Sequence, residues 1–126
     1  MTAGINLVND ATAYRPGDLV AGTVGWAFSA VPQSAVVRLL WRAEGKGSPD
    51  GRVVTTMQFQ GFRAVDRREF RLSLPAMPYS FSGAVLGIVW QVEFVARLHR
   101  FRPEQVQAFR RITMSPTGDA IDPYRR

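Results

Sequence analysis

Arginine dominates the side chains of this sequence that could take part in chemistry. Fifteen of the sixteen basic residues are arginines, the exception being Lys46, and the formal net charge is +6. A guanidinium stays charged at neutral pH and presents a planar fork of donors to carboxylates and phosphates. The chain is therefore suited to acidic or phosphorylated proteins, nucleic acid or anionic lipid headgroups, and composition does not choose among them.

Residue types that support catalysis or metal binding are scarce. His99 is the only histidine and there is no cysteine, which excludes disulfides, thiolate ligands and sites with several histidines. No Gly-x-Ser-x-Gly motif accompanies the scattered serines. The segment Gly45 to Gly51, "GKGSPDG", lacks the spacing of a nucleotide-binding loop and is typical of a hairpin tip. We predict no enzymatic activity, cofactor, metal or small-molecule substrate.

Alternation of apolar and polar residues predicts the elements that position these side chains. Helical periodicity is nearly absent, and period-two runs recur with turn residues between them. The predicted strands are Ile5–Asn9, Leu19–Phe28, Ala35–Ala43, Arg52–Phe62, Arg68–Leu74, Val85–Arg100 and Gln105–Met114. Pro103 to Arg111 could instead open a short helix, but we interpret it as strand. The expected fold is all-β, a two-layer antiparallel immunoglobulin-like sandwich of about seven strands.

The same alternation assigns the inner faces of the strands. One side of the Val85–Arg100 run is apolar from Leu86 to Leu98, and Trp90 and Phe94 lie on it. The other inward sets are Val20, Gly22, Val24, Trp26 and Phe28; Ala35, Val37, Leu39 and Trp41; Val53, Thr55, Met57 and Phe59; and Phe70, Leu72 and Leu74. Glycines in the first long strand suggest that another backbone or a bulky side chain approaches closely there, or that the strand contains a bulge.

The composition fits one globular domain. With 46% hydrophobic and 21% charged residues, the chain is expected to pack a single core over residues 1–114, followed by a tail over 115–126. No apolar run is long enough to span a bilayer and no signal-peptide pattern is present, so a cytoplasmic location is expected.

A corner motif precedes the first long strand. In "RPGD", Pro16 fixes its backbone φ and Gly17 can adopt positive φ, which predicts a type II turn. The Asp18 carboxylate is expected to accept backbone hydrogen bonds at this corner.

Two blocks of the sequence resemble the N-terminal lobe of the arrestin-like superfamily, which includes arrestins, bacterial sporulation-control proteins and the arrestin-like subunit of retromer. The first is "INLVNDATAYRPGDLVAGTVGW", and the second is "FRLSLPAMPYSFSGAVLGIVWQVEF". The matching positions of the second block are Leu74, Pro75, Pro78, Ser80, Phe81, Gly83, Ile88, Trp90 and Val92. Of these, Pro75, Pro78 and Gly83 join Pro16, Gly17 and Asp18 as predicted structural corners. The family usually carries two such lobes, and the phosphate-sensing residues of arrestins have no clear counterpart here.

The resemblance implies a non-catalytic interaction or scaffold module. It would bind a protein partner, or a second copy of itself, through sheet edges or an arginine-rich face. The candidate partner-binding residues are Arg38, Leu40, Arg42, Arg67, Arg71, Arg97, Arg100, Arg110 and Arg111. The alternative interpretation is that these arginines are scattered over the surface, where they are simply solvated.

A different functional class is electrostatic binding of nucleic acid or anionic membrane. The C-terminal cluster Arg97, Arg100, Arg102, Arg110 and Arg111, with Phe101 and Phe109 between its members, would carry this function. Phenylalanines within β runs usually belong to the core, which argues against it.

Overall fold

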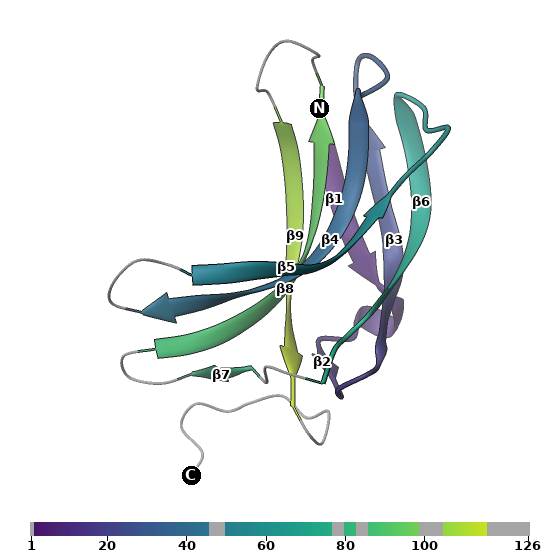
Figure 1. The fold of residues 1–126 in the computed structure, drawn as a ribbon. Helices are drawn as coiled ribbons and strands as arrows, with labels where there is room; N and C mark the ends of the chain where they lie inside the picture. Colours follow the sequence, from purple (N-terminus) through teal and green to yellow (C-terminus); the bar gives the residue numbers. More distant parts are fainter. Residues whose placement is uncertain (1, 46–49, 77–79, 83–85, 99–104, 116–126) are drawn as a thin grey trace.

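The computed structural model describes residues 2–45, 50–76, 80–82, 86–98 and 105–115, and these form an all-β structure (Figure 1). The long strands are β1 (Thr2–Leu7), β3 (Leu19–Ala27), β4 (Ser34–Gly45), β5 (Asp50–Gln58), β6 (Val65–Ser73), β8 (Leu86–Arg97) and β9 (Gln105–Met114). All seven predicted runs contain a strand, and the last is strand rather than helix. Val8–Asp10, predicted to be partly strand, is a 3-10 helix, η1.

The strands pair into two sheets that face each other (Figure 1). One has three strands in the order β1-β3-β6. The other has six, in the order β2-β9-β8-β4-β5, with β7 (Phe81–Ser82) also paired to β8. All pairs are antiparallel except that of β2 (Ala13–Tyr14) with β9. The predicted two-layer sandwich is confirmed, whereas β2 and β7, at two residues each, are too short to leave an alternating pattern.

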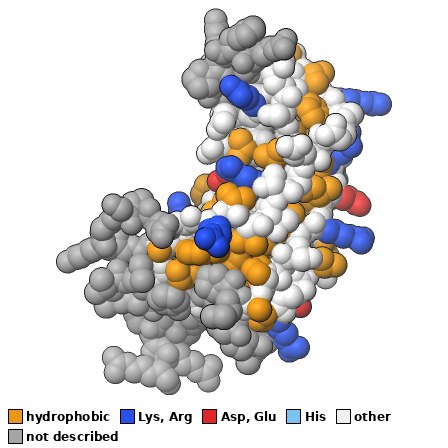
Figure 2. All heavy atoms as spheres, viewed as in Figure 1, with side chains coloured by type: hydrophobic (Ala, Val, Ile, Leu, Met, Phe, Trp, Pro, Cys, Tyr) orange, Lys and Arg blue, Asp and Glu red, His pale blue; other side chains and the backbone are white. Residues whose placement is uncertain are grey.

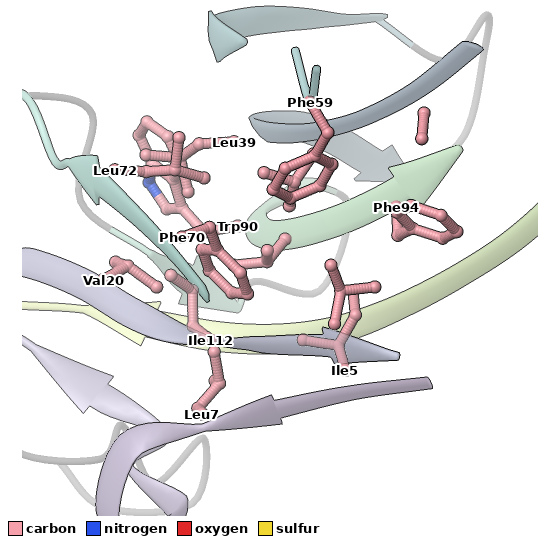
Figure 3. Close-up of a cluster of buried hydrophobic side chains, with 14 of the residues drawn as sticks. Ile5, Leu7, Val20, Leu39, Phe59, Phe70, Leu72, Trp90, Phe94 and Ile112 are labelled. Carbon is pink, nitrogen blue, oxygen red and sulfur yellow. The ribbon is translucent and has the colours of Figure 1, made fainter. Parts of the chain in front are cut away.

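The core lies between the sheets, where side chains from both converge (Figure 3). From the three-stranded sheet come the predicted inward residues of β3 and β6, with Ile5 and Leu7 of β1. From the six-stranded sheet come those of β4 and β8, with Ile112 and Met114 of β9. Trp90, Val92 and Phe94 have no exposed surface. Burial of each such large side chain contributes about 1.5 to 3 kcal/mol, so this alternating pattern is the main source of stability.

Trp26 forms the centre of an aromatic cluster at one end of the core. Its ring stacks on Phe94 across the sandwich, with centroids 5.2 Å apart, and on Phe28 at 6.4 Å. Phe59 and Phe62 pack against it at 6.0 and 6.3 Å. The indole N–H donates to the Arg63 carbonyl at 2.8 Å, which satisfies the polar atom that its burial would otherwise leave unpaired.

A β-bulge in β5 overturns one predicted face. Leu39 pairs with Thr55, but Leu40 pairs with Val53, so Val54 is the extra residue. Val54 packs against the core, and Val53, predicted to point inward, is 46% exposed. Beyond an inserted residue, the side chains that pointed inward point outward and the reverse. Nothing in the composition of "VVTTMQFQ" indicates where the bulge lies.

The Pro-Gly-Asp corner has the predicted geometry. Gly17 has φ +81°, and the Asp18 N–H donates to the Arg15 carbonyl at 3.1 Å, as in a type II turn. The Asp18 carboxylate accepts the Arg15 N–H at 2.8 Å. Backbone bonds of 3.1 and 2.9 Å join Gly17 and Asp18 to Leu74, at the end of β6. The turn therefore anchors the start of β3 to its neighbour. Pro75 follows that anchor, and Pro78 and Gly83 lie outside the described residues.

Replacing Gly17 with valine should lower the free energy of unfolding by more than about 1 kcal/mol, because a β-branched residue is strained at positive φ. A Cβ at Gly17 would meet no atom within 4 Å, so the loss would come from the backbone and not from a clash. Gly4→Val is the matched control, since its Cβ also meets open space and its φ is not positive. Equal denaturation midpoints for both variants and the unsubstituted chain would contradict the turn assignment.

Candidate functional site

Four of the candidate arginines, Arg38, Arg42, Arg67 and Arg71, lie in two pairs on opposite surfaces of the sandwich. Arg67 and Arg71 alternate with buried Phe70 and Leu72 on β6, so they lie on the outer face of the three-stranded sheet. Arg38 and Arg42 alternate with buried residues of β4, in the other sheet. The single cationic face that would join these four residues is therefore not formed.

Strand pairing instead gathers a second set of the predicted residues on the outer face of the six-stranded sheet. Leu40 of β4 lies between Val53 of β5 and Gln91 of β8, and Gln91 pairs in turn with Arg111 of β9. We call this surface the arginine face. Its outward residues are Val53, Thr56 and Gln58 of β5; Val36, Arg38, Leu40 and Arg42 of β4; Val89, Gln91, Glu93, Val95 and Arg97 of β8; and Gln105, Gln107, Phe109 and Arg111 of β9.

The arginine face carries an excess of positive charge. Among the side chains that the structure describes, it holds Arg38, Arg42, Arg97 and Arg111 against a single carboxylate, Glu93. Arg38 donates to Glu93 from the adjacent strand, and the two side chains are 34% and 14% exposed. Arg38 is thus paired within the sheet, and the described side chains of the face include more arginines than carboxylates.

Apolar side chains lie among these charges. Phe109 is 58% exposed although it belongs to a strand, and Val53, which is 46% exposed, lies beside the half-buried Leu40. The expectation that Phe109 packs in the core is wrong, because its register partner is Glu93 on the outer side of β8. Figure 2 shows hydrophobic and basic side chains intermixed near the middle of the view.

Gln91 adds a buried polar group to this surface. Its side chain is only 5% exposed although it points outward, and its amide Nε2 lies 3.4 Å from the Glu93 carboxylate. Its Oε1 is buried without a hydrogen-bond partner among the described residues. A buried acceptor left unpaired costs about 1 to 3 kcal/mol, and this oxygen is covered by its neighbours, so it is not open to a donor from outside the sheet. Alternation alone predicts that Gln91 points outward, but its burial depends on which strands flank it.

The C-terminal arginines do not form one cluster. Arg110 and Arg111 are neighbours on β9 and point to opposite faces: Arg111 pairs with outward Gln91 and Arg110 with buried Val92. Arg110 donates to the Ile5 carbonyl of β1 at 2.9 Å, which joins the edges of the two sheets. Arg97 is on the arginine face six residues from Gln91 along β8, about 20 Å away. Arg100 and Arg102 lie outside the described residues.

The charged residues at the start of β6 have a structural role. The Asp66 carboxylate accepts the backbone N–H groups of Arg63 and Arg67 at 3.0 and 2.8 Å and pairs with Arg68 at 3.2 Å. These interactions, the hydrogen bond from Arg63 foremost, hold the pKa of Asp66 below its ordinary value. Arg68 also donates to the Gly61 carbonyl at 2.8 Å. These interactions of Asp66 and Arg68 hold the loop before β6 in place. They account for the charged residues at this point without a bound ligand.

Grooves on the described surface are small. One of about 220 Å³ lies between Asn6, Asp10 and Arg110, and another of about 330 Å³ lies at the ends of β4 and β5, beside Gln33, Gln58 and Phe62. Within residues 2–45, 50–76, 80–82, 86–98 and 105–115, no three side chains of the metal-binding types cluster. In the same segments no helix is long and apolar enough to span a membrane. His99 and Lys46 lie outside the described residues.

Comparison with known proteins places the fold. No protein-family model and no curated protein matches the sequence. Among solved structures, the chain is similar to Spo0M, a sporulation control protein from Bacillus subtilis, with a TM-score of 0.63 and 16% sequence identity. The match covers 90% of this chain and 49% of that one, so this chain spans about half the length of its structural neighbour. The expected arrestin-like fold is confirmed.

Proposed function

We propose that the chain is a non-catalytic interaction module that binds an acidic partner protein through the arginine face. The observation that carries this proposal is the register of β5, β4, β8 and β9, which brings several arginines and exposed apolar side chains onto one surface with one described carboxylate. The similarity to a sporulation control protein supports a regulatory role of this kind.

The chemistry of the face suits a protein ligand. Guanidinium groups pair with carboxylates through two hydrogen bonds and raise the rate of encounter with an acidic surface. Phe109 and Val53 offer apolar contact area, and aromatic and arginine side chains supply most of the energy in protein interfaces. Acidic side chains around an apolar anchor are therefore the complement that this surface favours.

The arrangement gives less support to nucleic acid as the ligand. That hypothesis needs arginines and aromatic rings on one groove, and Arg110 is turned to the inner side of β9. Phe109 is the one aromatic side chain of the face that the structure describes as exposed, so successive bases would find no second ring there among the described residues.

Removing Arg42 and Arg111 together should weaken partner binding roughly tenfold, because each contributes a charge-assisted contact at the edge of the interface. The Arg42→Gln, Arg111→Gln variant would be expressed with a tag in the native cell. The amount of each protein recovered with it at physiological salt would then be measured by quantitative mass spectrometry.

The matched control is Arg67→Gln with Arg71→Gln, which removes the same charge from the opposite surface of the sandwich. We expect this control to retain the partner at the level of the unsubstituted protein. Equal loss in both double variants would contradict the proposal, since it would indicate a dependence on net charge and not on the arginine face. Recovery of nucleic acid that salt removes would favour the electrostatic alternative.

A further inference from the structure

The outer edge of β9 is only partly covered. On its inner side, Gln105 to Ile112 pair with β8 in unbroken register. On its outer side, β2 pairs with Thr113 and Met114 alone. No other strand among the described residues pairs with this edge, so the stretch Gln105–Phe109 presents a row of backbone groups that can template a further strand.

Hydrogen bonds at the end of β9 show which groups face outward. The Thr113 N–H donates to the Thr12 carbonyl at 2.7 Å, beside β2, whereas Met114 bonds to Ser80 on the opposite side. Backbone groups of successive strand residues alternate in direction. The N–H and C=O groups of Gln105, Gln107 and Phe109 therefore point to the same open edge as those of Thr113.

The other edges of the sandwich carry features that oppose strand addition. β6 has five charged residues in nine, at positions 66 to 69 and 71, and β5 is interrupted by the bulge at Val54. The Ile5 carbonyl of edge strand β1 is engaged by Arg110. Unlike β5 and β6, the stretch Gln105–Phe109 contains no charge, no proline and no bulge. It lacks the devices by which proteins protect edge strands from pairing.

We propose that β9 pairs with β9 of a second copy of this chain, antiparallel about a two-fold axis at Gln107, and so joins the two six-stranded sheets. Gln105 and Phe109 then lie opposite each other, and Gln107 lies opposite itself. The backbone N–H and C=O groups of all three residues point to the open edge, so the pairing makes about six main-chain hydrogen bonds between the two copies. On the face of the sheet that is turned to the core, Val106 of one copy lies opposite Ala108 of the other. The paired stretch contains no charged residue. A second copy is the partner that fits this edge, because the N–H and C=O groups of two identical, uncharged strands can bond to each other across one two-fold axis.

The test is the mass of the protein in solution as a function of concentration, measured by sedimentation equilibrium. Gln107→Pro removes one N–H from the open edge and leaves the hydrogen bonds to β8 intact. Gln107→Lys places two like charges at the two-fold axis. Each should raise the dimer dissociation constant at least tenfold. Gln58→Lys makes the same chemical change on the opposite edge of the same sheet and should leave the constant within about twofold.

A protein that stays monomeric up to about 200 µM would overturn the proposal, since pairing weaker than that has no use at cellular concentrations. So would dimerisation that Gln58→Lys abolishes and Gln107→Lys does not. Circular dichroism shows whether the Gln107→Pro protein folds. If that protein does not fold, the result for Gln107→Lys decides the test. None of these changes removes an arginine from the arginine face, so failure here leaves the acidic-partner proposal standing, and the reverse also holds.

Discussion

Replacing Phe94 with alanine is expected to lower the free energy of unfolding by about 3 to 5 kcal/mol, the usual cost of removing a large buried aromatic side chain. Phe94 has no exposed surface and stacks on Trp26 with centroids 5.2 Å apart and planes 12° from parallel. Because the two rings belong to different sheets, their contact holds the layers together. The cavity left by alanine would also remove the support under Trp26. Urea denaturation followed by tryptophan fluorescence measures the change.

Phe109→Ala is the matched control, since it makes the same chemical change on the adjacent strand β9 at a side chain that is 58% exposed. It should change the free energy of unfolding by less than about 1 kcal/mol. If the two variants had similar stabilities, the assignment of inner and outer faces in the six-stranded sheet would be wrong.

Replacing Gly22 with alanine is expected to cost about 3 kcal/mol, at the upper end for overpacked sites. A Cβ on Gly22 would lie 2.2 Å from the Asn6 carbonyl oxygen of β1 and 3.0 Å from Cζ of Phe70. The first contact is with backbone, so no side-chain rotation relieves it and β1 must shift. Thermal denaturation followed by circular dichroism would report the loss.

Gly25→Ala tests the same substitution three residues further along β3. Its Cβ would meet only the Asp66 carbonyl oxygen, at an ordinary 3.8 Å. We expect no loss of stability there and a gain of at most about 1 kcal/mol, because alanine restricts the unfolded chain more than glycine. A Gly22→Ala protein as stable as Gly25→Ala would show that the close approach of β1 to β3 is not tightly fixed.

Alternation in the sequence was sufficient to predict the core. Where the structure describes their side chains, the inward sets of β3, β4, β6 and β8 lie in the core or pack against it, because a strand with one buried face must place apolar residues at every second position. Gly22 was predicted to mark a close approach, and it lies against β1. The Pro-Gly-Asp turn was likewise predictable, since few residue pairs other than Pro-Gly favour that geometry.

The candidate surface was only partly predictable, because it depends on which strands are neighbours. Alternation places Arg38 and Arg71 on outer faces, but the order of strands in each sheet decides that they belong to opposite surfaces. The exposure of Phe109 and the burial of Gln91 follow from the register between β8 and β9, which no local pattern specifies. The bulge that turns Val53 outward is a third effect of pairing.

The central claim is that a partner protein binds the outer face of the six-stranded sheet, and photo-crosslinking from single positions tests it most directly. Val53 on the arginine face and Val65 on β6 are both exposed valines, at 46% and 66%, on opposite surfaces of the sandwich. Each would be replaced in turn by a photoreactive phenylalanine, and the protein irradiated in its native cell. We predict a discrete covalent adduct with another protein from position 53 and none from position 65. Adducts from position 65 alone, or adducts with nucleic acid from position 53, would contradict the claim.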